Sequence, residues 1–162
     1  MEIEVRIRGI LVDPSTNMPI VVLKDIASDQ VMPIWIGSFE ANAIAFEIEK
    51  VATPRPMAHD LIQKLIQYLN GELERVVIAE IRGDTYVASL WIRQNDATIF
   101  VDARPSDAIA LALRADCPIF VDEEVMRTAR LQANSQGGPQ SADQLKHWLE
   151  GLGDDDLGQY KM

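Results

Sequence analysis

Apolar and polar positions alternate in three stretches near the start of the chain, which is the pattern of β-strands. The segments "EIEVRIRGILV" and "PIVVLKD" flank the turn-forming residues "DPSTNM" and predict a hairpin, and "QVMPIWIG" predicts a third strand. The spacing becomes helical in "SFEANAIAFEIEKV", where one face carries Ala41, Ile44, Ala45 and Ile48. The first part of the chain therefore predicts a hairpin, a strand and a helix in that order.

A second helix is predicted after the segment "TPRP". The stretch "MAHDLIQKLIQYLN" places Leu61, Leu65, Ile66 and Leu69 on one side of a helix. This apolar stripe predicts a face that packs on the core, and Gly71 is the expected end of the helix.

The order of elements then repeats. "ERVVIAEIRGDTYVASLWIRQ" predicts a hairpin around its Gly-Asp turn, "ATIFVDA" a strand and "RPSDAIALALRAD" a helix. At an offset of 65 residues, "IWI" at 34–36 falls on "IFV" at 99–101, and "AIA" at 43–45 falls on "AIA" at 108–110. Two similar helices after two similar strands can also arise by chance. We interpret the pattern as a duplicated hairpin–strand–helix unit, which predicts an α+β fold with a curved, barrel-like, largely antiparallel sheet and helices packed on it.

The composition changes towards the end of the chain. "CPIFVDEEVM" predicts a further short strand that leads into a helical turn, and "NSQGGPQS" has the composition of a flexible linker. "ADQLKHWLEGLG" predicts one short helix, and "DDDLGQYKM" an acidic end. We expect one domain over residues 1–133, followed by a linker, a short helix and an acidic tail over 134–162.

Composition and charge narrow the classes of protein to consider. With 162 residues, 48% of them hydrophobic and 25% charged, the chain is typical of a soluble globular domain. The single cysteine excludes an intramolecular disulfide and a cysteine-rich zinc site, and no segment has the pattern of a signal peptide or membrane span. We therefore expect a cytoplasmic protein without a membrane partner. A net charge of −10 disfavours long-range attraction to nucleic acid, so such a partner requires a local basic patch or bound metal ions.

Candidate chemistry begins at the start of the helix in "DARPSDAIALALR". Pro105 suits a first helical turn, where Ser106 and Asp107 can accept hydrogen bonds from free backbone N–H groups. The same arrangement has a functional interpretation, because a helix N-terminus beside Arg104 can bind a phosphate or carboxylate. Asp102 and Asp107 also flank this point and offer oxygen ligands to a divalent metal.

A second Arg-Pro pair opens the helix in "EKVATPRPMAHDL". Here His59 and Asp60 lie in the first turn, after Arg55. Capping plus an exposed histidine is one interpretation. The other is that His59 serves as a general base or metal ligand, with Asp60 or Glu49 as its carboxylate partner. The only other histidine, His147, lies in the predicted tail.

Other reactive or aromatic residues have structural interpretations. Cys117 precedes the apolar segment "PIFV" and is expected to be a buried small hydrophobe. Trp35 and Trp91 fall on predicted strands and are expected in a core or an interface. Glu40 and Glu47 lie on one helical face and could line a cleft, although a solvated helix face is the preferred interpretation. The chain has no Gly-rich phosphate loop, dinucleotide fingerprint, H-E-x-x-H motif or nucleophile elbow.

The ordered motifs "PIWIG", "EK…PRP…HDL" and "RPSDAIALA…PIFV" resemble the bacterial bifunctional nuclease domain family over residues 3–125. The resemblance implies an α+β fold with a duplicated unit, cleavage of both DNA and RNA, a divalent cation such as Mg²⁺ or Mn²⁺, and a homodimer or higher homo-oligomer. Many members continue into a short helical-hairpin module, which residues 134–162 do not match. The positions that match the family's polar motif residues are Glu49, Arg55, His59, Asp60, Arg104, Ser106 and Asp107.

Two hypotheses about function remain open at this point. In a nuclease, Arg55 and Arg104 bind the scissile phosphate beside Ser106, and His59 activates water or protonates the leaving group. The metal is then held by Glu49, Asp60 and Asp107. In the alternative, the domain is a non-enzymatic oligomeric binding or regulatory scaffold in which the same residues cap and pair helix ends. An open cleft that gathers Arg55, His59, Arg104 and Asp107 favours the enzyme, whereas Arg104 buried against Asp60 or Glu49 favours the scaffold.

Overall fold

The computed structural model describes residues 1–14 and 16–135. Over these residues the chain forms seven strands and four helices. None of these four helices is long and apolar enough to cross a membrane. The short helix and acidic end predicted further along lie outside the described residues. The elements are β1 (Glu2–Val12), β2 (Pro19–Asp25), β3 (Val31–Trp35), α1 (Ser38–Ile48), α2 (Ala58–Tyr68), β4 (Gly71–Arg82), β5 (Thr85–Gln94), β6 (Ala97–Ala103), α3 (Pro105–Ala115), β7 (Ile119–Asp122) and α4 (Glu123–Ser135).

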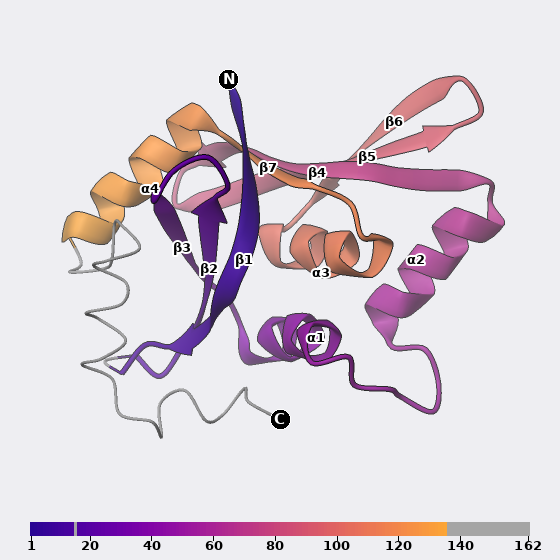
Figure 1. Cartoon of the computed structure of the whole chain (residues 1–162), viewed down its shortest axis with the longest axis horizontal. Helices are drawn as coiled ribbons and strands as arrows, with labels where there is room; N and C mark the ends of the chain where they lie inside the picture. The colour runs from indigo at the N-terminus through magenta and orange to yellow at the C-terminus, as the bar shows by residue number, and fades with distance from the viewer. Residues whose placement is uncertain (15, 136–162) are drawn as a thin grey trace.

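The strands form a single sheet in the order β3-β2-β1-β7-β4-β5-β6. All neighbouring strands are antiparallel except β4 and β7, which are parallel. Each half of the chain contributes a three-stranded meander followed by a helix, and β7 joins the two meanders (Figure 1). The predicted α+β fold with a duplicated, largely antiparallel unit is confirmed. The sheet stays open, with β3 and β6 at its edges.

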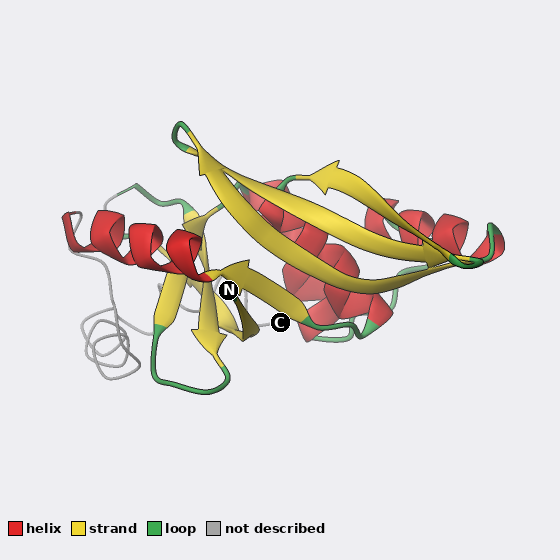
Figure 2. Ribbon diagram, turned by 90° about the horizontal axis from the view of Figure 1, so that it is seen from above, coloured by secondary structure: helices red, strands yellow, loops and turns green. Residues whose placement is uncertain are grey.

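Helices α1, α2 and α3 gather on one side of β4 and β5, while α4 lies at the other end of the molecule (Figures 1 and 2). Helix α3 is central, and its residues 108–112 have almost no exposed surface. Their sequence "AIALA" alternates small and large side chains, so α1 can pack closely on α3 while Ile109 and Leu111 fill the core. This packing holds the N-terminal ends of α1, α2 and α3 near one another.

The ends of the helices follow simple backbone chemistry. Lys50, Asn70 and Asp116 come just after α1, α2 and α3, and each adopts the left-handed conformation that turns a chain out of a helix. The predicted end of α2 at Gly71 is therefore one residue late, because Asn70 turns the chain and Gly71 opens β4. The helical turn predicted after β7 is a longer helix, α4.

The predicted burial of α2 is wrong. The helix has the expected apolar stripe, but none of its residues is buried, and Leu61 and Leu65 are both 51% exposed. Hydrophobic periodicity reports that a helix has an apolar face, not which surface covers it. The stripe of Leu61, Leu65 and Leu69 is thus an apolar surface open to a partner.

Candidate active site

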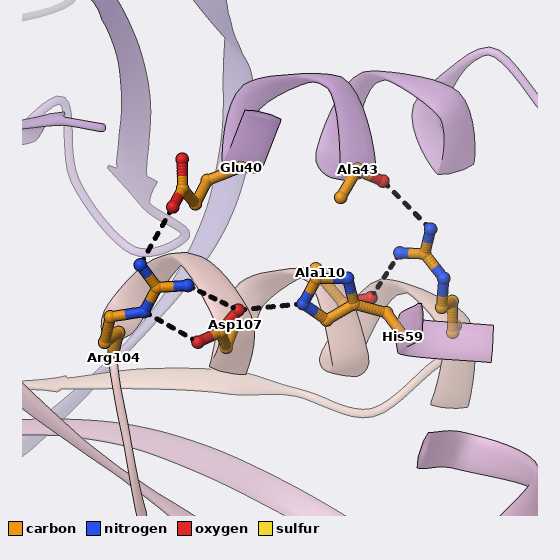
Figure 3. Close-up of polar contacts among 7 residues, drawn as sticks. Glu40, Ala43, His59, Arg104, Asp107 and Ala110 are labelled. Carbon is orange, nitrogen blue, oxygen red and sulfur yellow. Dashed lines mark hydrogen bonds and ion pairs between the residues drawn. The ribbon is translucent and has the colours of Figure 1, made fainter. Parts of the chain in front are cut away.

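The two helix starts that carry the Arg-Pro pairs meet in space (Figure 3). His59 in the first turn of α2 reaches Asp107 in the first turn of α3, with 2.9 Å between Nε2 and Oδ1. Arg104, directly before α3, donates from Nε to Oδ2 of Asp107 at 2.9 Å and from Nη2 to Oδ1 at 3.2 Å. The structure therefore brings together three of the predicted site residues, although 48 positions of sequence separate His59 from Asp107.

Glu40 of α1 joins this group from the other half of the duplication. Arg104 donates from Nη1 to Oε1 of Glu40 at 2.8 Å. The Glu40 side chain is only 22% exposed beside Arg104 and lines a cavity, so the preferred expectation of a solvated helix face is wrong and the alternative, a position in a cleft, is confirmed. Gly37, which precedes α1, allows this position, because a Cβ atom there would collide with the Glu40 carboxylate.

A cavity of about 350 Å³ lies at this group, lined by His59, Arg104, Asp107 and the apolar side chains of α1 and of the start of α2. A smaller cavity of about 260 Å³ lies on the other side of the Arg104–Glu40 pair and is lined in part by Ser106. The Arg104 side chain is 63% exposed, whereas His59 is largely shielded. The arrangement is a shielded imidazole–carboxylate pair beneath an open guanidinium group.

The electrostatics of the group keep its carboxylates charged. Burial alone would raise the pKa of Asp107, but hydrogen bonds from Arg104 and His59 outweigh it and lower the pKa below its usual value. A hydrogen bond from its own backbone N–H, and a second from Arg104, lower the pKa of Glu40. The hydrogen bonds that Arg104 donates to Asp107 and Glu40 raise the pKa of Arg104. At neutral pH one fixed positive charge therefore lies between two fixed negative charges.

A second arginine–carboxylate pair holds the helices together. Arg114, only 6% exposed, donates to Oδ1 of Asp60 at 2.8 Å. It also donates to the backbone carbonyls of Ala110 and Ala43 at 2.8 and 3.0 Å, which are the two carbonyl contacts drawn in Figure 3. Oδ2 of Asp60 accepts the backbone N–H of Met57 at 3.0 Å and so caps α2. Arg114 thereby ties α1, α2 and α3 to one another beneath the cavity.

Comparison with known proteins identifies the family. The sequence pattern of the Bifunctional nuclease domain matches residues 21–134. The chain belongs to the bifunctional nuclease domain family. The resemblance predicted from the motifs is confirmed, and every residue of the group around Arg104 falls within the matched range.

Relatives of this bifunctional nuclease domain fall into two groups. An uncharacterized protein of Mycobacterium tuberculosis strain H37Rv is 38% identical over 162 residues, covering 95% of this chain and 97% of the relative. Bifunctional nuclease 1 of Oryza sativa subsp. indica is 25% identical over 116 residues, which cover 70% of this chain and 35% of the rice protein. Bifunctional nuclease 2 of Oryza sativa subsp. japonica is 27% identical over 118 residues, with 70% and 36% covered.

The remaining candidate residues of the bifunctional nuclease domain lie apart from the cluster. Glu49 is exposed at the end of α1, and Arg55 is exposed in the loop before α2; neither is among the described residues that line the 350 Å³ cavity. Ser106 is buried in the first turn of α3, and Asp102 is exposed on β6. Cys117 is half-buried, and burial raises the pKa of its thiol to about 11, as expected for an unreactive side chain.

The predicted divalent cation needs several converging oxygen ligands. Among the residues that the structure describes, no group of three or more His, Cys, Asp or Glu side chains is placed to hold one. Both carboxylate oxygens of Asp60 and of Asp107 already accept hydrogen bonds from arginine, backbone or histidine groups. Glu49, Asp60 and Asp107 thus do not form a prepared metal site in this conformation.

The contact of Glu40 with Arg104 and the role of Arg114 were not predicted from the sequence. Glu40 carries no motif of its own, because an acidic residue in a first helical turn is common on solvated helices. Arg114 likewise looks like the ordinary basic residue in the last turn of a helix. Their roles depend on which helices pack side by side, and the sequence pattern does not contain that information.

Proposed function

We propose that this bifunctional nuclease domain cleaves phosphodiester bonds of DNA and RNA at Arg104, Asp107 and His59. The observation that carries the proposal is the exposure of Arg104 over a cavity that also contains the His59–Asp107 pair. A scaffold was expected to bury Arg104 against Asp60 or Glu49. The buried structural arginine is instead Arg114, which leaves Arg104 open to a ligand.

Arg104 is the phosphate-binding group in this proposal. A guanidinium group has five N–H donors, and three of those of Arg104 are used by Asp107 and Glu40. The two that remain can donate to two oxygens of one phosphate. Glu40 and Asp107 hold the guanidinium plane in place, so little side-chain entropy is lost when the substrate binds.

His59 is the proton-transfer group. With Nε2–H donating to Asp107, Nδ1 is left as an acceptor that can take a proton from an attacking water molecule. Asp107 fixes this tautomer and stabilises the imidazolium that forms, and Arg104 stabilises the charge that develops on the phosphate. Asp60 is a positioning residue, because it caps α2 next to His59 and both of its oxygens are engaged.

A divalent cation is a further part of the proposal and rests on the family resemblance. Glu40 and Asp107 contribute two negative charges and Arg104 one positive charge. The cluster alone is therefore net negative and repels a phosphate. Mg²⁺ or Mn²⁺ would supply the missing positive charge. The residues do not form a prepared metal site, so we assign no metal ligands.

Cleavage of labelled single-stranded DNA and RNA by the purified full chain tests the proposal, with Mg²⁺, with Mn²⁺ and with EDTA. We expect His59→Gln and Asp107→Asn to lower the cleavage rate by about 100-fold or more, the range of general acid–base catalysis. Glu47→Gln is the matched control, since Glu47 is an equally shielded carboxylate of the same helix as Glu40, pairs with Lys50 and is not among the described residues that line the 350 Å³ cavity. Equal rates in wild type and the three variants would overturn the assignment of the active site. Cleavage unaffected by EDTA would overturn the requirement for a divalent cation.

We also propose a homodimer, through the exposed apolar stripe of α2. Leu61, Leu65 and Leu69 repeat every four residues and form one ridge along the helix. A two-fold axis places the same ridge of a second copy against it, which buries both. The family resemblance implied an oligomer, and this stripe is an exposed apolar surface that fits a second copy.

A further inference from the structure

The face of the sheet that α1–α3 leave uncovered carries a row of rings around an arginine. Phe100 of β6 meets Trp91 of β5 edge to face, with 5.0 Å between ring centroids and 84° between planes. The guanidinium carbon of Arg75, on β4, lies 4.0 Å from the centroid of Trp91 and 4.4 Å from that of Phe120 on β7. These four residues, here called the aromatic row, cross four adjacent strands.

The alternation of side chains places the aromatic row on the opposite face from the helices. Trp91 lies between Leu90 and Ile92, which point towards the core beneath α3. Figure 2 shows β4, β5 and β6 in front of α1–α3, so these helices cover only the far face of the strands in that view. Phe100 is 61% exposed, which leaves much of its ring open to solvent.

We propose that the aromatic row is a stacking platform for single-stranded nucleic acid. Exposed rings on a sheet surface can stack against unpaired bases with little regard to sequence, because every base has a π-face. Arg75 lies against the rings of Trp91 and Phe120 and supports them, so the exposed ring of Phe100 is the surface open to a base. This inference rests on the proposed nuclease function and names single strands as its substrate class.

The charges around the aromatic row favour this occupant over an apolar protein surface. Arg75 pairs with Glu2, and the neighbouring Arg93 pairs with Glu72 and Glu74. Glutamate is depleted at protein–protein interfaces, and three glutamates border the aromatic row. The apolar surface that fits a second copy lies elsewhere, on α2.

The same charges determine how the nucleic acid would be held. The three glutamates outnumber the two arginines, so phosphate neutralisation contributes little. We therefore expect binding with a shallow dependence on salt, and a preference for single strands over duplexes, whose bases are already stacked on one another. Strand β6 carries Phe100 and ends at Ala103, next to Arg104. A strand stacked on the row can thus pass the end of β6 and enter the proposed active site.

The test measures binding without cleavage. In the full-length chain with His59→Gln, the fluorescence anisotropy of a labelled oligothymidylate gives the dissociation constant. Adding Phe100→Ala is expected to weaken binding about fivefold or more, the loss of one stacked base. Ile99→Ala is the matched control, because Ile99 is the partly exposed neighbour of Phe100 whose side chain points to the opposite face of β6. The affinity of this variant for the oligothymidylate is expected to be unchanged.

The other outcomes distinguish the stacking platform from an interface with a second copy and from the proposed nuclease activity. No binding by the parent protein, or equal affinity after Phe100→Ala, overturns the platform. A smaller oligomer after Phe100→Ala in light scattering also overturns it, because the aromatic row would then contact a second copy. Binding that needs Phe100, in a wild-type chain that cleaves neither DNA nor RNA, would reject the proposed nuclease and leave the platform standing.

Discussion

Arg104 and Arg114 begin and end the same helix, yet their environments differ: Arg104 is open to a ligand and has the proposed role in catalysis, whereas Arg114 is buried and structural. The Arg104 side chain is 63% exposed and bonds only to Glu40 and Asp107 among the described residues. The Arg114 side chain is 6% exposed and joins three helices through Asp60 and two backbone carbonyls. An exposed ion pair contributes little to folding, whereas a buried one is costly to break.

Substitution of the two arginines tests this separation. Arg114→Met should lower the free energy of unfolding by about 3 kcal/mol, because it leaves Asp60 and two carbonyls without their donor. Arg104→Met should cost no more than about 1 kcal/mol but should abolish cleavage. Urea unfolding of both variants measures the difference. A larger loss of stability for Arg104→Met than for Arg114→Met would contradict the account.

The lowered pKa values of Asp60, Asp107 and Glu40 predict the direction of the acid response. A carboxyl whose pKa is lower in the folded state contributes stability above its unfolded pKa, and loses it as pH falls through the folded value. The ordinary values are 3.8 for the two aspartates and 4.5 for Glu40. The urea midpoint should therefore fall as pH drops below about 4.5.

Asp60→Asn is the variant that checks this cause. Burial alone would raise the pKa of Asp60, and hydrogen bonds from Met57 and Arg114 outweigh that effect. The asparagine cannot titrate, so the fall in urea midpoint between neutral pH and pH 3 should be smaller in the variant. An identical fall in both proteins would mean that other groups govern the acid response.

At the scale of elements, α2 shows what hydrophobic periodicity can and cannot predict. The positions of Leu61, Leu65 and Leu69 correctly predicted a helix with an apolar face. They did not predict its exposure, because the surface that covers a face is set by other parts of the chain or by a partner. The strands and helices of both duplicated units were predicted for the same reason that α2 was: local alternation and spacing determine the type of element.

The proposed dimer gives α2 a direct test. Leu65→Gln places a polar group in the centre of the ridge and should shift the protein from dimer to monomer in light scattering. The fold should be kept, because Leu65 is already 51% exposed within one chain. Leu131→Gln is the control, since Leu131 is an exposed leucine on α4. A wild-type protein that is monomeric at micromolar concentration would exclude the dimer.

At the scale of the whole molecule, the duplication explains why the candidate site forms. Each unit ends in a helix that follows its third strand, so α1 and α3 are equivalent elements that pack on each other. Their packing brings Glu40 to Arg104, and α2, inserted between the units, adds His59. The individual candidates His59, Arg104 and Asp107 were recognisable from the motifs. Their convergence, and the separation of Glu49 and Arg55 from them, follows from tertiary packing.

The most direct test of the central claim measures the cleavage rate of labelled single-stranded RNA and DNA by wild type and by His59→Gln. Thermal unfolding first checks that the two proteins are equally stable. The account predicts cleavage of both substrates by wild type and a loss of about 100-fold or more in the variant. Equal cleavage by the two proteins, or no cleavage by wild type with Mg²⁺ or Mn²⁺ present, would contradict it.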